Sequence, residues 1–444
     1  MVLQKNTLRF LLLLGVALTY PAHGALTIEV TGGTEGAQPI AIVPFGWDGS
    51  GALPTDVAAI VAADLHRSGA FAPLPEGDLI SQPHEGPQIN FADWRVLGSP
   101  NIVVGKVRPS GNGYMVQFQL FDVFKGTQIT GYSIASTTRE LRRTAHQISD
   151  LIYETLTGQP GAFATRIAYV TETQANAKSR YSLYVADADG YNPIPILHSP
   201  APLMSPSWSP DGKRLAYVSF ERRRSEIYIH DIATRQRDLV ASSQGLNSAP
   251  TWSPDGQRMA LVLSKDGNPE IYILNIKNKT LQRITNNPAI DTEPGWTPDG
   301  ARLVFTSDRG GKPQIYQVAV SGNGGANGTG SKPQRLTFEG DYNAHGVVSP
   351  DGRSLVMVHG QGDRFRIAVQ NLSSNDLRIL TDTRLDESPS FAPNGAIIVY
   401  ATEVGNRGVL GMVSLDGTVR QRLTQTEGDA REPAWGPRTH RIKP

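Results

Sequence analysis

The phrase Trp208-Ser-Pro-Asp211-Gly212 recurs with small changes along the C-terminal two-thirds of the chain. Its six copies begin at Trp208, Trp252, Trp296, Val348, Phe391 and, in a truncated form, Trp435. The intervals between these starting residues are 44, 44, 52, 43 and 44 residues. A repeat of this length is typical of four-stranded β-propeller blades. The period therefore predicts an array of blades.

Each repeat contains the parts of one blade. In the second copy, Pro254 and Gly256 stand at the second and fourth positions of a four-residue turn, which is the type I pattern. Strand-like segments follow at residues 258–263, 270–274 and 281–285. The matching segment at residues 215–218 is apolar at consecutive positions, so both of its faces should be buried between stacked blades.

The first and last repeats are incomplete in complementary ways. Residues 166–170 match residues 214–218, yet no turn phrase precedes them, and the missing phrase appears at residues 432–437 with no blade after it. Circular closure explains both facts: the C-terminal strand supplies the innermost strand of the first blade, which removes open sheet edges. We therefore predict a small α/β N-terminal domain followed by an all-β six-bladed propeller closed by a C-terminal strand. The Gly- and Asn-rich residues 321–331 account for the longer interval as a surface loop.

The first 24 residues are predicted to be a secretory signal peptide. Lys5 and Arg9 precede an apolar run at residues 10–18, and small residues stand at Ala22 and Gly24. The run is too short to span a bilayer as a helix. We expect cleavage after Gly24 and export of the remaining chain.

Composition excludes several classes of function. The chain has no cysteine, which rules out disulfides, thiol catalysis and Cys-ligated zinc. Its 42 basic and 41 acidic residues become 40 and 41 once Lys5 and Arg9 are removed, a net charge of −1. Near-neutrality argues against a general nucleic-acid or anionic-membrane surface. We expect a monomer that does not insert into the membrane.

Residues 25–160 have the pattern of a separate α/β domain, and the propeller is assigned to residues 161–444. Helical spacing of apolar residues ends at glycine in two of its segments. Strands are expected at residues 25–30, 39–45, 101–107, 114–124 and 128–135, and helices at residues 54–68, 91–97 and 138–156. The junction is expected at residues 159–161.

Sequence motifs for catalysis are missing. The chain contains no Gly-x-Ser-x-Gly, no His-Glu-x-x-His and no phosphate-binding Gly-x-x-x-x-Gly-Lys-Ser/Thr. Its turn aspartates supply one acid per turn, too few for calcium, so no cofactor or metal is expected. The alternative is a periplasmic propeller hydrolase, which would require paired acids at working separation. Its candidate acids are Asp291, Glu293, Asp386, Glu387 and Glu432.

Residues 39–45, 60–65, 165–170 and 202–206, together with the six turn phrases, resemble the TolB family over essentially the whole mature chain. The resemblance implies a periplasmic, non-enzymatic adaptor of the Tol–Pal envelope system. Such an adaptor binds the peptidoglycan-associated lipoprotein, Pal, and the inner-membrane-anchored TolA. It supports outer-membrane invagination during cell division and envelope integrity, and group A colicins exploit it in some hosts.

The resemblance also implies two partner sites. The TolA site is the N-terminal segment Leu26, Thr27, Ile28, Glu29 and Val30, a short strand that can pair with its own domain or add to a partner's edge. The Pal site is the propeller mouth. In this chain the implied positions are Met204, Asn247, Asp291, Thr292, Glu293, His345, Asp386, Glu387 and Glu432. These positions lead into the strands nearest the axis, where loops on a rigid scaffold usually carry function.

Overall fold

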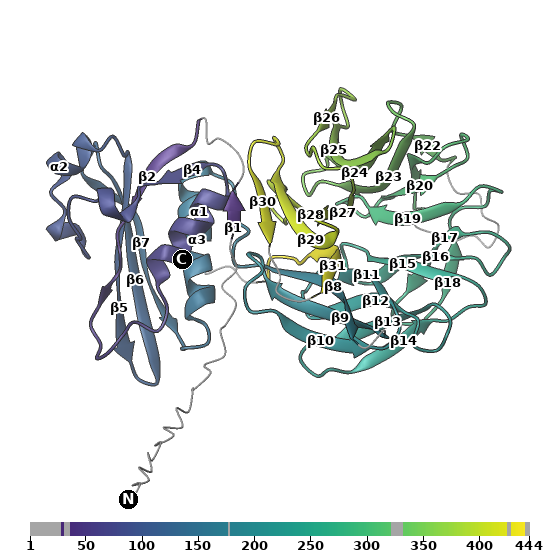
Figure 1. Ribbon diagram of the computed structural model, residues 1–444, viewed down its shortest axis with the longest axis horizontal. Coiled ribbons are helices and arrows are strands. Elements are labelled where there is room, and N and C mark those ends of the chain that lie inside the picture. Colours follow the sequence, from purple (N-terminus) through teal and green to yellow (C-terminus); the bar gives the residue numbers. More distant parts are fainter. Residues whose placement is uncertain (1–27, 31–35, 176–177, 321–331, 424–427, 440–444) are drawn as a thin grey trace, which may run out of the picture.

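A computed structural model describes residues 28–30, 36–175, 178–320, 332–423 and 428–439. Figure 1 shows an α/β domain, coloured purple and blue, beside a β-propeller coloured from teal to yellow. The predicted signal peptide, Leu26, Thr27 and the 321–331 loop lie outside the described residues. Within the described ranges, no helix combines the length and apolar content that a membrane crossing needs.

The α/β domain is a six-stranded sheet in the order β4-β2-β5-β6-β7, with β3 paired to β5. Its strands are β2 (Gln38–Ile42), β3 (Gly46–Trp47), β4 (Phe71–Pro73), β5 (Asn101–Ser110), β6 (Gly113–Asp122) and β7 (Thr127–Ser136). Its helices are α1 (Val57–Arg67), α2 (Phe91–Val96) and α3 (Leu141–Thr157), with short 3₁₀ turns η1 (Glu76–Asp78) and η2 (Gly86–Gln88). The three helices and the β5–β7 meander agree with the sequence prediction within a few residues.

Helices α1 and α3 lie between this sheet and the propeller (Figure 1). The apolar stripe of α3 is buried at Leu141, Ala145, Ile148 and Ile152, as the helical spacing predicts. The helix ends at Gly158, whose φ of 73° is a left-handed conformation that glycine adopts without a Cβ clash. The opposite face of α3 is therefore available for contact with the propeller.

The propeller has six blades, and each described sheet is antiparallel. Blade one is β31 (Asp429–Trp435), β8 (Arg166–Ala175), β9 (Lys178–Asp187) and β10 (Ile194–Ser199). Blade two is β11 (Leu203–Trp208), β12 (Arg214–Ser219), β13 (Glu226–Asp231) and β14 (Arg237–Ala241), and blade three is β15 (Asn247–Trp252), β16 (Arg258–Leu263), β17 (Glu270–Asn275) and β18 (Leu281–Arg283). Blade four is β19 (Asp291–Trp296), β20 (Arg302–Ser307), β21 (Gln314–Ala319) and β22 (Gln334–Arg335), and blade five is β23 (Tyr342–Val348), β24 (Ser354–Gln361), β25 (Arg364–Asn371) and β26 (Leu377–Ile379). Blade six contains β27 (Asp386–Phe391), β28 (Ile397–Val404), β29 (Arg407–Ser414) and β30 (Arg420–Leu423).

The predicted circular closure is confirmed. Strand β31 pairs antiparallel with β8, and the register places Trp435 opposite Ile167 and Ala430 opposite Thr171. The indole Nε1 of Trp435 also donates a hydrogen bond of 2.8 Å to Oγ1 of Thr165. The last strand of the chain thus completes the first blade, and the ring has no open edge at this junction.

The recurring turn phrase joins neighbouring blades. Gly212 N donates to Ser209 O at 2.8 Å, which closes the expected four-residue turn. The arginine that begins the second strand of one blade lies over the tryptophan of the next, in a cation–π arrangement. The distances from guanidinium to ring centroid are 5.0 Å for Arg166 on Trp208, 4.6 Å for Arg214 on Trp252 and 4.8 Å for Arg258 on Trp296. These tryptophans pack blades together.

The N-terminal strand lies where neither sequence alternative placed it. Strand β1 (Ile28–Val30) pairs antiparallel with β30, the outermost strand of blade six, so it joins the propeller and not its own domain. The register places Ile28 opposite Leu423 and Val30 opposite Gln421. The free edge of β30 explains this placement, because an unpaired strand edge offers hydrogen-bonding groups to any extended segment.

A buried carboxylate holds the connection between the two domains. Asp150 of α3 accepts hydrogen bonds from the backbone amides of Phe163 (2.7 Å) and Ala164 (3.2 Å). Gly161 approaches it so closely that a Cβ there would lie 2.3 Å from Oδ1. Burial raises the pKa of Asp150 from 3.8 to about 6 despite the two amides.

This shift predicts a specific pH dependence. Because the pKa of Asp150 is higher in the folded than in the unfolded chain, its stabilising contribution is present below about pH 4 and is lost as pH rises through about 6. Two pKa units correspond to about 3 kcal/mol. In urea unfolding, Asp150→Asn should not show this pH-dependent loss of unfolding free energy between pH 4 and pH 7. The control Asp238→Asn, at an exposed position of β14, should keep it. If the free energy of unfolding changed with pH by the same amount in the parental protein and in Asp150→Asn, the assignment would be contradicted.

Candidate functional site

The innermost strand of every blade contains a β-bulge at the same place. The strand register shifts once in each of β11, β15, β19, β23, β27 and β31. One residue in each bulge has a positive φ between 47° and 53°. These residues are Ser205, Ala249, Glu293, His345, Ser388 and Glu432. A left-handed conformation is unfavourable for residues with a Cβ, so its sixfold repetition marks a feature built into the ring.

The six bulged residues surround one axial cavity of about 760 Å³, which is lined by the inner strands of all six blades. We call the opening of this cavity at the start of the inner strands the mouth. A bulge changes the direction of its side chain relative to the strand. The bulges therefore bring six side chains from six blades to one cavity wall.

Carboxylates link neighbouring bulges around the cavity. Glu293 Oε2 accepts hydrogen bonds from His345 N (2.8 Å) and from Thr306 Oγ1 (2.7 Å). Glu432 accepts a hydrogen bond from Ser205 N in the same way, between blades one and two. Burial raises the pKa of Glu432, although the Ser205 amide acts in the opposite direction. Both acids thus link the inner strands of neighbouring blades, and both line the cavity.

Three of the predicted Pal positions are buried in the structure. Asn247, Asp291 and Asp386 are each 0% exposed. They hold loops in place: Arg309 Nη2 donates to Asp291 at 2.6 Å, Asn247 Nδ2 donates to Ser243 O at 2.7 Å, and Thr381 Oγ1 donates to Asp386 at 2.5 Å. Burial raises the pKa of both Asp291 and Asp386. These three residues therefore hold the loops around the mouth, and their contact with Pal stays a prediction.

The remaining predicted positions reach the surface or the cavity. Met204 and Glu387 are exposed or nearly so, with 40% of Met204 and 39% of the Glu387 side chain accessible. Thr292, Glu293, His345 and Glu432 are partly buried. Glu387 lies 3.8 Å from Arg431 Nη1, and His345 Nδ1 lies 3.8 Å from Glu293 Oε1. Of the nine predicted positions, six line the cavity: Met204, Glu293, His345, Asp386, Glu387 and Glu432.

Two exposed apolar residues beside the starts of inner strands were missed by the sequence analysis. Leu246 is 37% exposed and Ile290 is 49% exposed. Each comes directly before a buried polar residue, Asn247 or Asp291, at the start of an inner strand. The signal for the bulges was also present, because proline follows the bulged residue in every copy except His345-Gly346. Proline has no amide hydrogen for the ladder and is tolerated at bulges.

A six-bladed propeller with a mouth of this kind and an N-terminal α/β domain defines a class of two-domain propeller proteins. Two family models match this chain: the TolB amino-terminal domain over residues 26–129 and the TolB β-propeller domain over residues 153–439. The chain belongs to the TolB family.

Similar proteins cover almost the whole chain. It is 56% identical over 442 residues to the "Tol-Pal system protein TolB" of Xanthomonas campestris pv. campestris, which covers 98% of this chain and 99% of that protein. The protein of the same name from Xanthomonas oryzae pv. oryzae is also 56% identical over 442 residues, with the same coverage. The crystal structure of TolB from Acinetobacter baumannii is 42% identical, with a TM-score of 0.85, and covers 93% of this chain and 100% of that one.

The family assignment gives this chain its general role: it is a non-enzymatic component of the Tol–Pal system of the cell envelope. The hydrolase alternative is also disfavoured by the mouth itself. Asp291 and Asp386, two of its five candidate acids, are each 0% exposed, and one oxygen of each accepts hydrogen bonds from neighbouring side chains.

Proposed function

We propose that this chain is a periplasmic adaptor that binds Pal at the propeller mouth and TolA through residues 26–30. In this role it supports outer-membrane invagination during cell division and envelope integrity, and it acts as a monomer. The observation that carries the proposal is the convergence of six bulged inner strands on one lined cavity. A rigid scaffold that presents side chains from every blade at one opening is suited to recognition of a protein surface.

The chemistry of the mouth supports a protein partner. Met204, Leu246 and Ile290 are exposed apolar side chains at the starts of three consecutive blades. Glu293, Glu387 and Glu432 add acidic groups around the cavity. Apolar anchors beside polar groups are typical of protein interfaces, where methionine is enriched and a few central residues supply most of the binding free energy.

The placement of β1 supports a separate role for the N-terminal segment. Within the described part of the segment, Ile28, Glu29 and Val30 pair with β30, and this pairing holds them to blade six. A short edge strand is released at low cost and can then pair with another protein. Pal can bias this release only if it binds one placement of the segment better than the other.

The mouth assignment predicts a large effect of one substitution. Met204→Glu places a charge at the centre of the proposed contact, and we expect Pal binding to weaken about tenfold or more. The matched control is Leu239→Glu, because Leu239 is 39% exposed in the same blade but lies on its outermost strand, β14. Calorimetric titration should give the parental dissociation constant for the control.

Both variants should melt at the parental temperature, since both side chains are already exposed to solvent. Parental affinity of Met204→Glu for Pal would remove the mouth as the Pal site. Equal weakening by both variants would also contradict the proposal, because it would show an effect of charge that does not depend on position.

A further inference from the structure

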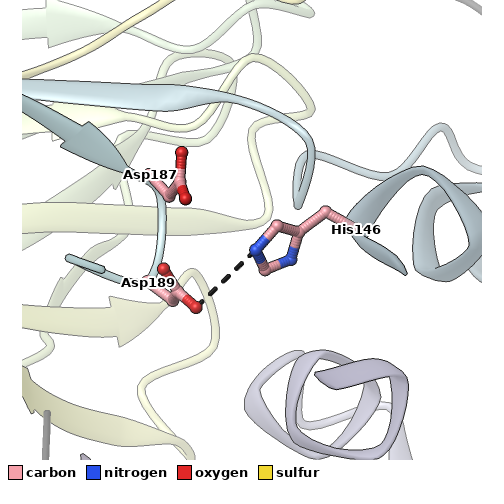
Figure 2. Close-up of side chains that lie close together, drawn as sticks. All are labelled: His146, Asp187 and Asp189. Atoms are coloured by element: carbon pink, nitrogen blue, oxygen red, sulfur yellow. Dashed lines mark ion pairs between the residues drawn. The ribbon is translucent and has the colours of Figure 1, made fainter. Parts of the chain in front are cut away.

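Four ionisable side chains from both domains meet at the seam between helix α3 and blade one. His146 of α3 and Asp64 of α1 are 2% and 1% exposed. Asp187 and Asp189 stand at the end of β9 and just after it. Figure 2 shows His146 directed from its helix toward both aspartates of the propeller. Neither proposed partner site uses any residue of this cluster.

One nitrogen of His146 is held by protein, and the other is not. His146 Nδ1 lies 2.6 Å from Asp64 Oδ2, which also accepts a hydrogen bond of 2.7 Å from Ser149 Oγ. In the neutral imidazole, a carboxylate at Nδ1 favours the tautomer with its proton there, which leaves a lone pair on Nε2. Among the described residues, Nε2 is buried without a hydrogen-bond partner. It lies 3.7 Å from Asp189 Oδ2, which is too long for a hydrogen bond.

The distances suit a shared metal ion. One donor atom from each of His146, Asp187 and Asp189 lies within 4.8 Å of the other two. Two ligands bound at about 2.0–2.1 Å around tetrahedral zinc stand roughly 3.3 Å apart, close to the spacing between Nε2 and Asp189. A histidine that binds metal through one nitrogen and contacts a carboxylate through the other is the usual arrangement around zinc.

The cluster combines carboxylates with cationic groups. Asp64, Asp187 and Asp189 face the guanidinium groups of Arg67 and Arg142, and Arg166 also acts on Asp187. Arg67 Nη2 pairs with Asp64 at 2.5 Å, whereas Arg142 pairs with Asp189 from the edge of the seam. The side chain of Arg142 is 24% exposed, so it can turn toward solvent. A divalent cation would then take the place of the Arg142 guanidinium beside Asp187 and Asp189.

We propose that this seam is a binding site for a divalent cation of the zinc type, with His146 Nε2, Asp187 and Asp189 as ligands. Asp64 orients the imidazole, and Arg142 competes with the cation for Asp189. Imidazole favours zinc over calcium or magnesium, which take oxygen ligands. The bound cation would connect α3 of the α/β domain to blade one. This inference does not depend on the proposed binding of Pal or TolA.

The test is a calorimetric titration of Zn²⁺ into the chelator-treated full-length protein, combined with thermal melting. We expect one ion per chain and a melting temperature that rises with zinc concentration, because the ion binds only the folded state. His146→Asn keeps an amide N–H near the position of Nδ1 and removes Nε2. It should weaken zinc binding by about 100-fold or more, beyond the 10–100-fold that loss of a supporting residue typically costs.

Two further variants make the outcome decisive. His345→Asn alters the mouth histidine that lies beside Glu293, and it should bind zinc like the parental protein. Arg142→Gln removes the competing cation and should bind zinc several-fold more tightly, which also tests the site if His146→Asn does not fold. Parental zinc affinity in His146→Asn, loss of binding in His345→Asn, or unchanged affinity in Arg142→Gln would each overturn the proposal.

Discussion

Removal of residues 429–444 is expected to abolish cooperative unfolding of the propeller and to cause aggregation. The deletion takes away β31, the innermost strand of blade one, and leaves β8 as a long unpaired edge. Ala430 and Trp435, which are buried in the core shared by the first and last blades, are lost with it. An exposed edge of this length is a template for pairing with other chains.

The measurement is calorimetric melting together with size-exclusion chromatography. Trp435→Ala is the graded control: it keeps the strand and the ring but removes the buried indole, and it should cost about 3–5 kcal/mol while unfolding remains cooperative. A truncated protein that elutes as a monomer and melts at the parental temperature would contradict the role of β31 in closure.

Deletion of residues 25–33 is expected to abolish TolA binding and to leave Pal binding intact or tighter. The deletion removes the proposed TolA segment, including the three residues that pair with β30. No mouth residue is removed. Pal binding to the deleted protein would also no longer include the free-energy cost of docking the segment, so the affinity for Pal should be unchanged or higher. Pal binding serves as the internal control for folding. Parental affinity of the deleted protein for TolA would show that TolA binds elsewhere.

The ring was predictable because its signals are local and repeated. A turn phrase such as Trp252-Ser-Pro-Asp255-Gly256 specifies the same turn in each blade. The first repeat lacks this phrase and the C-terminus has an additional copy, so circular closure of the ring explains both. The bulges were missed although proline follows five of the six bulged residues. Their common geometry is a property of the inner strands together, and no single repeat displays it.

The burial of individual mouth residues depends on neighbours that the sequence does not identify. Asp291 is sequestered by Arg309 and Asp386 by Thr381, residues that come from adjacent loops. A polar residue at the start of a strand has the same appearance in sequence whether it caps a loop or faces a partner. The same reason explains why sequence did not reveal the seam, where His146 and Asp189 belong to different domains.

The placement of β1 was unpredictable for a related reason. A three-residue strand has too little pattern to select a partner, so the available edge decides where it pairs. Strand β30 offers such an edge because it is the outermost strand of blade six. Residues 28–30 of the proposed TolA segment therefore lie on the propeller, which also contains the mouth.

The central claim is an adaptor whose two partners bind different sites and influence each other through the N-terminal segment. Titration of TolA into the full-length protein, alone and saturated with Pal, tests it most directly. We predict that Pal weakens TolA binding by about 5–150-fold, and that TolA weakens Pal binding by the same factor. TolA affinity that is unchanged by saturating Pal would contradict the account.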